Sequence, residues 1–187
     1  MVLAVISVLF LVAAILAAHF IAPPEYNWRV HTISELAAQK YRNGPVMRAG
    51  FIGFGILLSS AVLLKWISAS FPVKYIPLMV YSASVLISGL FSTSPFISNL
   101  DFSVREAKIH SFFAQLAGFS FSVGILLFMI YEDRMGLKIV HFAFFLFVIL
   151  TSLLFGRIHR YRGILQRLLY LGSFVWLVIF LGLLHKV

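Results

Sequence analysis

The sequence predicts an all-α polytopic membrane protein: a six-transmembrane-helix bundle with a short interfacial helix in the first loop. Of its residues, 61% are hydrophobic and only 11% are charged, whereas soluble domains carry about 25% charged residues. The apolar residues form long continuous runs without the period-two alternation of a transmembrane barrel, which leaves helices as the spanning elements. We therefore expect a single transmembrane domain over residues 1–187.

Six apolar runs each approach the ~20 residues that a helix needs to cross ~30 Å of hydrocarbon. The first run has no basic segment before it and is longer than the core of a signal peptide, so we expect it to be retained. The fifth is the shortest. We place the spans at about residues 2–22, 46–67, 76–98, 108–131, 139–156 and 165–185.

Lys and Arg residues predict the orientation, because loops one, three and five with their flanks hold ten of them and the opposite side holds five. By the positive-inside rule we expect a multi-pass protein of the cell (inner/cytoplasmic) membrane, with loops one, three and five in the cytoplasm and both termini outside. The net charge of +9 then indicates contact with anionic membrane lipids rather than nucleic acid. The ten residues are Arg29, Lys40, Arg42, Arg48, Arg105, Lys108, Arg157, Arg160, Arg162 and Arg167.

The first loop, residues 23–45, is the longest connection between spans. Thr32 and Glu35 have the spacing of a capping box, which predicts a short helix through about Lys40. Ser103 and Glu106 repeat this spacing before the fourth span.

Two groups of small or polar residues predict which helix faces point inward. Ser84, Ser88 and Ser92 follow one another at intervals of four in the third span, so we expect this stripe to face other helices. Ala114 and Gly118 in the fourth span have the spacing that lets helix backbones approach closely. We expect both faces to be buried.

His110 with Asp101 is the strongest candidate for a functional site. His110 shares a helical stripe with Ala114, and an ionisable residue inside a membrane is a functional hypothesis by default. Asp101 is not needed as the helix cap because Ser103 fills that role, so it is free to pair with His110 or with a cation. The alternative is a buried imidazole that bonds a neighbouring helix and only stabilises packing.

His31 and Glu35 form the second candidate, because residues four apart share one helix face and could bind a metal or transfer a proton. The alternative is that Glu35 only completes the capping box, with His31 preceding the cap. A divalent metal, if present, would take His110, Asp101 or His31, since the chain has no Cys. A pair of His19 and His110 is too little to indicate haem.

The fifth loop and its flank form the third candidate. Guanidinium groups with an aromatic residue between them suit the phosphate of a lipid headgroup. The alternative is an ordinary basic loop that touches anionic lipid. The residues are Arg157, Arg160, Arg162 and Arg167.

Several short motifs, spread over nearly the whole chain, resemble the membrane proteins grouped as domain of unknown function 998. The resemblance implies a bacterial or archaeal multi-pass membrane protein with no assigned activity. The motifs are Ile33-Ser34-Glu35-Leu36, Asn43 with Pro45, Gly50-Phe51 to Gly55, Asp101 nine residues before His110, and Gly163 leading to Gln166-Arg167.

Two classes of function are consistent with the sequence. The first is a lipid- or solute-binding or accessory membrane module, with a polar rim at the end formed by loops one, three and five. An accessory module would have a protein partner in the membrane. The alternative is an intramembrane enzyme, such as a metal-dependent hydrolase or transferase, that acts on a lipid headgroup through His110, Asp101 and Glu35. Convergence of these three side chains within about 4–6 Å would favour the enzyme.

Overall fold

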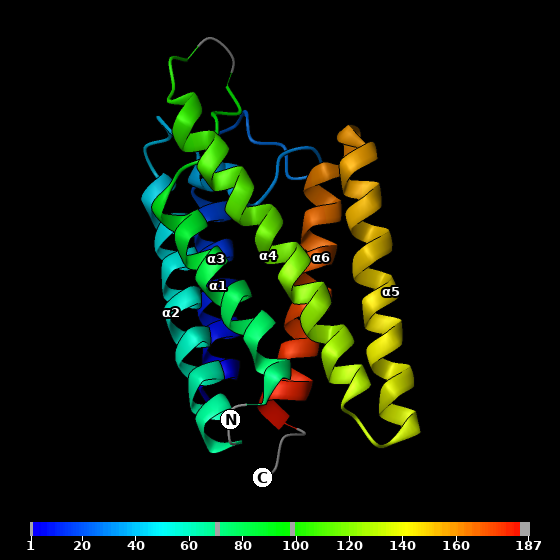
Figure 1. The fold of residues 1–187 in the computed structure, drawn as a ribbon. Helices are drawn as coiled ribbons and strands as arrows, with labels where there is room; N and C mark the ends of the chain where they lie inside the picture. Colours follow the sequence, from blue (N-terminus) through cyan, green and yellow to red (C-terminus); the bar gives the residue numbers. More distant parts are fainter. Residues whose placement is uncertain (1, 70–71, 98–99, 184–187) are drawn as a thin grey trace.

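The computed structural model describes residues 2–69, 72–97 and 100–183, which form a bundle of long helices (Figure 1). Within these residues, six helices are long and apolar enough to cross a membrane. The protein is therefore an all-α multi-pass membrane protein, as the sequence predicts. The helices are α1 (Val2–Phe20), α2 (Gly44–Ser68), α3 (Ile76–Leu90), α4 (Val104–Ile130), α5 (Met135–Arg157) and α6 (Arg162–Leu177).

Successive helices run in opposite directions, so loops 1, 3 and 5 gather at one end of the bundle (Figure 1). We call this the loop 1/3/5 end. Helices α1 to α4 pack side by side, whereas α5 lies at the edge of the bundle beside α6 (Figure 1). Gly55 of α2 lies directly against the backbone of Leu86 in α3, where a larger residue would hold the helices apart.

The core at the opposite end joins α4, α5 and α6 through aromatic rings. Trp176 of α6 is fully buried, and its ring lies 5.1 Å from that of Phe128 and 5.4 Å from that of Phe180. Its indole nitrogen donates a hydrogen bond of 3.1 Å to Nδ1 of His141 in α5. Both polar groups thereby avoid the cost of being buried without a partner.

The ends of the helices differ from the predicted bounds in ways that the local contacts explain. Helix α3 ends at Leu90, well before the expected residue 98, which itself lies outside the described residues. Extended chain begins at Phe91, and side chains of α2 and α4 bind the last carbonyls of α3. Helix α4 begins at Val104, as the spacing of Ser103 and Glu106 predicts, since the Ser103 hydroxyl accepts a hydrogen bond from the Glu106 N–H.

The expected interfacial helix is a single 3₁₀ turn, η1 (Ser34–Ala37), rather than a helix through Lys40. Its capping box is present, because Glu35 accepts hydrogen bonds from the N–H and hydroxyl of Thr32. Lys40 adopts a positive φ of 61°, a conformation that cannot continue a helix. Short 3₁₀ turns also precede α3 and α6, as η2 (Val73–Tyr75) and η3 (His159–Tyr161), and π-helix η4 (Val178–Leu183) extends α6.

One of the two predicted inward faces is confirmed and the other is wrong. Ser84, Ser88 and Ser92 are buried as expected. Ala114 and Gly118 are exposed, and a side chain added at Gly118 would contact nothing. The buried stripe of α4 instead passes through His110 and Ala117, because α3 packs on a face turned away from the small pair.

Candidate functional site

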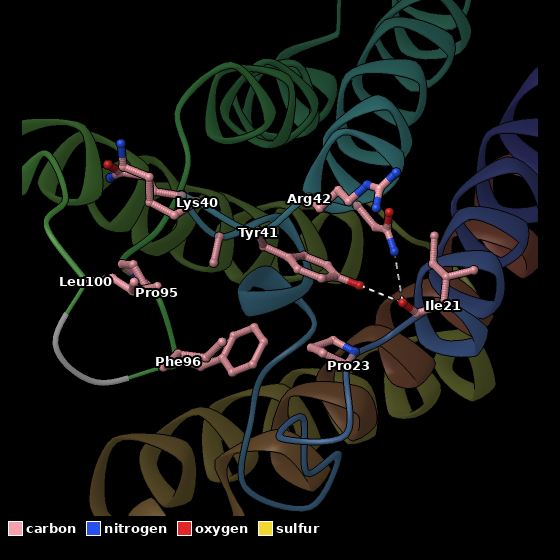
Figure 2. Close-up of a pocket in the computed structure, with 12 residues that line it drawn as sticks. Ile21, Pro23, Lys40, Tyr41, Arg42, Pro95, Phe96 and Leu100 are labelled. Carbon is pink, nitrogen blue, oxygen red and sulfur yellow. Dashed lines mark hydrogen bonds between the residues drawn. The ribbon is translucent and has the colours of Figure 1, made fainter.

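Loop 1 (residues 21–43) covers the loop 1/3/5 end and is hydrogen-bonded to loop 3 and to α6. The two ends of loop 1 are bonded to each other next to α1. The Tyr41 hydroxyl and the Asn43 amide donate hydrogen bonds of 2.8 Å and 3.1 Å to the carbonyl oxygen of Ile21. Figure 2 shows both bonds beside a cavity of about 330 Å³ between loop 1 and loop 3. The ring of Phe96 from loop 3 meets that of Tyr41 edge to face at this cavity.

Loop 1 also supplies hydrogen-bond acceptors to the first turn of α6. A helix leaves its first N–H groups without partners in the helix. Here the N–H of Gly163 donates to the carbonyl of Val30 at 3.1 Å, and that of Ile164 donates to the carbonyl of Arg29 at 3.3 Å. Gly163 permits this approach, since a side chain there would collide with the backbone of Trp28.

Arg167, predicted to bind a lipid headgroup, lies at the centre of the contact between loop 1 and α6. Its Nη1 donates to the carbonyls of Trp28 at 2.8 Å, His31 at 3.2 Å and Gly163 at 2.8 Å. Its Nη2 donates to the Tyr26 hydroxyl at 2.8 Å. Burial raises the pKa of Tyr26, although the nearby Arg167 charge opposes this. Arg167 therefore has a structural role, whatever else it binds.

Two glutamines complete the attachment of loop 1: Gln166, which belongs to a motif of the family resemblance, and Gln39, which the sequence did not single out. Gln166 of α6 accepts a hydrogen bond from the N–H of Ile33 and donates one of 3.2 Å to the Ser34 hydroxyl. Gln39 joins loop 1 to loop 3, with its amide donating to the carbonyl of Ser103 and accepting from the N–H of the same residue. The only sequence signal of Gln39 is an uncharged amide flanking a span, whereas Gln166 also stands in the motif that begins at Gly163.

His110 and its neighbours bind the C-terminal end of α3. Nδ1 of His110 lies 2.8 Å from the carbonyl oxygen of Ser88 and 2.9 Å from that of Phe91. Since both partners can only accept, Nδ1 carries the proton. One helical turn earlier, the Glu106 carboxylate accepts a hydrogen bond of 2.7 Å from the N–H of Ser92. This geometry agrees with the interpretation of His110 as a buried imidazole that stabilises packing.

Arg48 of α2 binds the same end of α3 from the other side. Its guanidinium donates to the carbonyls of Gly89 at 3.2 Å and Leu90 at 3.0 Å. Carbonyls in the last turn of a helix lack partners within the helix. The carbonyls at the end of α3 therefore bond two side chains, Arg48 of α2 and His110 of α4.

The other predicted site residues have separate local roles. Glu35 is held by Thr32 in the capping box, and Nδ1 of His31 accepts a hydrogen bond of 3.0 Å from the N–H of Asn27. Asp101 is exposed in loop 3. Within the part of the chain that the structure describes, no three His, Asp or Glu residues lie close enough together to hold a metal ion.

The basic residues of the loop 1/3/5 end form what we call the basic rim, the ten Lys and Arg residues named from the sequence. None of them has a carboxylate within 4.0 Å among the described residues, whereas Arg134 at the opposite end pairs with Glu132 at 2.9 Å. Arg157, Arg160 and Arg162 are all exposed. The guanidinium of Arg162 lies 4.9 Å from the ring of Phe155, which supports the side chain without neutralising its charge.

Comparison with known proteins identifies the family of the chain but no activity. No curated protein and no solved structure matches it. The model of one family, described as protein of unknown function (DUF998), matches residues 5–182. Since this match covers nearly the whole chain, the protein belongs to the DUF998 family.

Proposed function

We propose that this protein is a non-catalytic membrane module that binds anionic lipid through the basic rim. The observation that carries the proposal is the absence of carboxylate partners for the rim side chains among the described residues. Uncompensated Lys and Arg at a membrane surface each attract anionic lipid by about 1 kcal/mol. Planar guanidinium groups also suit phosphate oxygens, which accept two hydrogen bonds at once.

The proposal includes the orientation expected from the charge distribution. The basic rim would lie in the cytoplasmic leaflet of the cell membrane, which supplies the anionic headgroups, with both termini outside. The exposed Arg157, Arg160 and Arg162 would make the first contact with these headgroups. An accessory role beside another membrane protein is compatible with this arrangement, since the rim leaves the apolar faces of the bundle free.

The hydrogen bonds of the predicted catalytic residues support the module over an intramembrane enzyme. His110 is bound to α3 and Glu35 to Thr32. Each contact gives its side chain a structural role that requires no substrate. An enzyme acting on a lipid headgroup through His110, Asp101 and Glu35 would have to break the bonds of His110 and Glu35 before these groups could react.

Lipid titration of the purified protein, followed by native mass spectrometry, tests the proposal. Replacing Arg157, Arg160 and Arg162 by Gln should weaken phosphatidylglycerol binding by roughly a hundredfold, given about 1 kcal/mol for each of the three charges. Phosphatidylcholine binding should not change. The matched control replaces Lys74, Arg134 and Lys138 by Gln, which removes the same charge from the opposite end. Equal effects of the two triple variants would contradict a specific role of the rim.

A further inference from the structure

A groove between α1 and α6, directly below loop 1, has the features of a binding site for one lipid molecule. Its volume is about 350 Å³. Ile15 and Leu16 of α1 and Leu171 and Phe174 of α6 form its apolar walls. Trp28 and Ile33 of loop 1 close the end nearest the membrane surface, and His19 and Arg167 also line the groove.

The groove opens sideways rather than towards the interior of the bundle. Leu16 is 52% exposed, Leu171 is 59% exposed and Trp28 is 44% exposed. Because α1 and α6 are membrane-spanning helices, the medium that these walls face is lipid hydrocarbon. A tryptophan at the edge of an apolar surface is typical of the depth at which headgroups begin.

One end of the groove is cationic and has no acidic lining residue. Arg167 has no carboxylate within 4.0 Å in the described part of the chain. Its hydrogen bonds use Nη1 and one proton of Nη2, which leaves the Nε proton and the second Nη2 proton without partners among the described residues. A charge-assisted bond to a phosphate oxygen is the strongest bond open to these donors.

We propose that the groove holds one anionic phospholipid, with an acyl chain between α1 and α6 and its phosphate at Arg167, beside Trp28 and His19. This rests on the proposed function, that the loop 1/3/5 end binds anionic lipid, and gives it a defined site. The charge of the groove argues against a second copy of the chain as occupant. A two-fold contact at this face would bring the Arg167 side chains of both copies together in a low-dielectric medium.

Quenching of Trp28 fluorescence by brominated lipids measures occupancy of the groove. The protein is reconstituted in phosphatidylcholine with increasing brominated phosphatidylglycerol, or with brominated phosphatidylcholine for comparison. Subtracting the signal of a Trp28→Phe variant removes the contribution of Trp66 and Trp176. We expect saturable quenching by brominated phosphatidylglycerol, with an apparent affinity about fivefold above that of the zwitterionic lipid, as one basic residue at the surface would provide.

Substitutions that fill the groove test its role without altering charge. Leu16→Phe and Leu171→Phe should each weaken the selective quenching severalfold. Leu9→Phe and Leu168→Phe are matched controls on the same helices, since both leucines are exposed and neither lines the groove. Arg167→Gln should abolish the preference for phosphatidylglycerol, and Lys138→Gln, at a cation of the opposite end of the bundle that does not line the groove, should leave it unchanged.

Each remaining outcome overturns the groove proposal in a recognisable way. Equal quenching by both lipids, insensitive to Leu16→Phe and Leu171→Phe, would show ordinary surrounding lipid. Absence of quenching by either lipid would show that a protein chain covers the groove. If phosphatidylglycerol still bound and only the triple rim variant weakened it, the groove proposal would fail and the proposed function would stand. Loss of all selectivity would reject both.

Discussion

Nδ1 of His110 in α4 lies 2.8 Å from the carbonyl oxygen of Ser88 in α3, and both residues are buried. The imidazole therefore supplies a proton to a helix end that would otherwise expose unbonded carbonyls inside the membrane. Such groups are costly there because hydrocarbon offers no hydrogen bonds. The relationship explains an ionisable residue in a span without invoking a reaction.

Replacing His110 by Ala should lower the free energy of unfolding by about 1–3 kcal/mol, the cost of leaving a buried polar group unsatisfied. Thermal unfolding of the purified protein in detergent measures this effect. His159→Ala is the control, since His159 is exposed in η3. If His110→Ala were as stable as the control, the hydrogen bond to α3 would not contribute to the stability of the fold, and a functional role for His110 would regain support.

Gly163→Ala should detach loop 1 from α6, because the added methyl group would collide with the carbonyl oxygens of Trp28 and His31. Relief of such a collision typically costs about 1–3 kcal/mol. Limited proteolysis within loop 1 should therefore become faster. Gly118→Ala is the matched control, since space is open there and Ala favours a helix over Gly by about 1 kcal/mol. Unchanged cleavage in Gly163→Ala would contradict the close contact.

Gln39→Leu should release loop 3 from loop 1, because the amide of Gln39 both donates to and accepts from the backbone of Ser103. Hydrogen exchange of the Ser103 N–H should accelerate, while exchange within α2 stays unchanged. Gln115→Leu, at an exposed glutamine of α4, supplies the comparison. Equal exchange at Ser103 in both variants would show that other contacts hold loop 3.

The Glu132–Arg134 pair predicts a pH dependence of stability. The hydrogen bond from Arg134 lowers the pKa of Glu132 from 4.5 to about 2. Because the pKa of Glu132 is lower in the folded protein, its ionised carboxylate contributes to the stability of the fold. This contribution is complete above pH 4.5 and is lost as the pH falls towards 2. The stability difference between the wild type and Glu132→Gln should follow this course in thermal unfolding. Asp133→Asn, at an exposed neighbour, should show no matching loss.

Single cysteines test the proposed orientation, since the chain contains no Cys of its own. A cysteine at Arg42 or Arg160 should react with a membrane-impermeant maleimide only after the cells are opened. One at Asp133, in the loop between α4 and α5, should react in intact cells. Both positions at the loop 1/3/5 end are exposed, so lack of reaction cannot arise from burial. The reverse pattern would invert the topology.

Local patterns predicted a large part of this molecule. The six spans follow from hydropathy because each helix satisfies its own backbone in lipid, whatever surrounds it. The capping box of Thr32 and Glu35 involves four consecutive residues and was readable for the same reason. Burial of Ser84 and Ser88 followed from helical periodicity, because a polar stripe avoids lipid, whereas Ser92 is buried in the chain beyond the end of α3.

Periodicity failed where two faces of one helix could each have packed inward. Ala114 and Gly118 offered close approach, yet α3 packs along the stripe of His110 and Ala117. The sequence of a helix shows which residues share each face. It does not show which of these faces a neighbouring helix packs against. The neighbour here is α3, whose Ser88 carbonyl oxygen lies 2.8 Å from Nδ1 of His110.

The sequence alone determined the fold class, the number of spans and the gathering of basic residues at one end, because each depends on composition along a short stretch of chain. Only the tertiary structure shows which polar groups are already hydrogen-bonded within the protein. His110 is bonded to α3 and Arg167 to loop 1, across 22 and 139 residues of sequence. Hydrogen bonds between distant segments form only when the packed helices bring donor and acceptor within about 3 Å, and no local pattern encodes that distance.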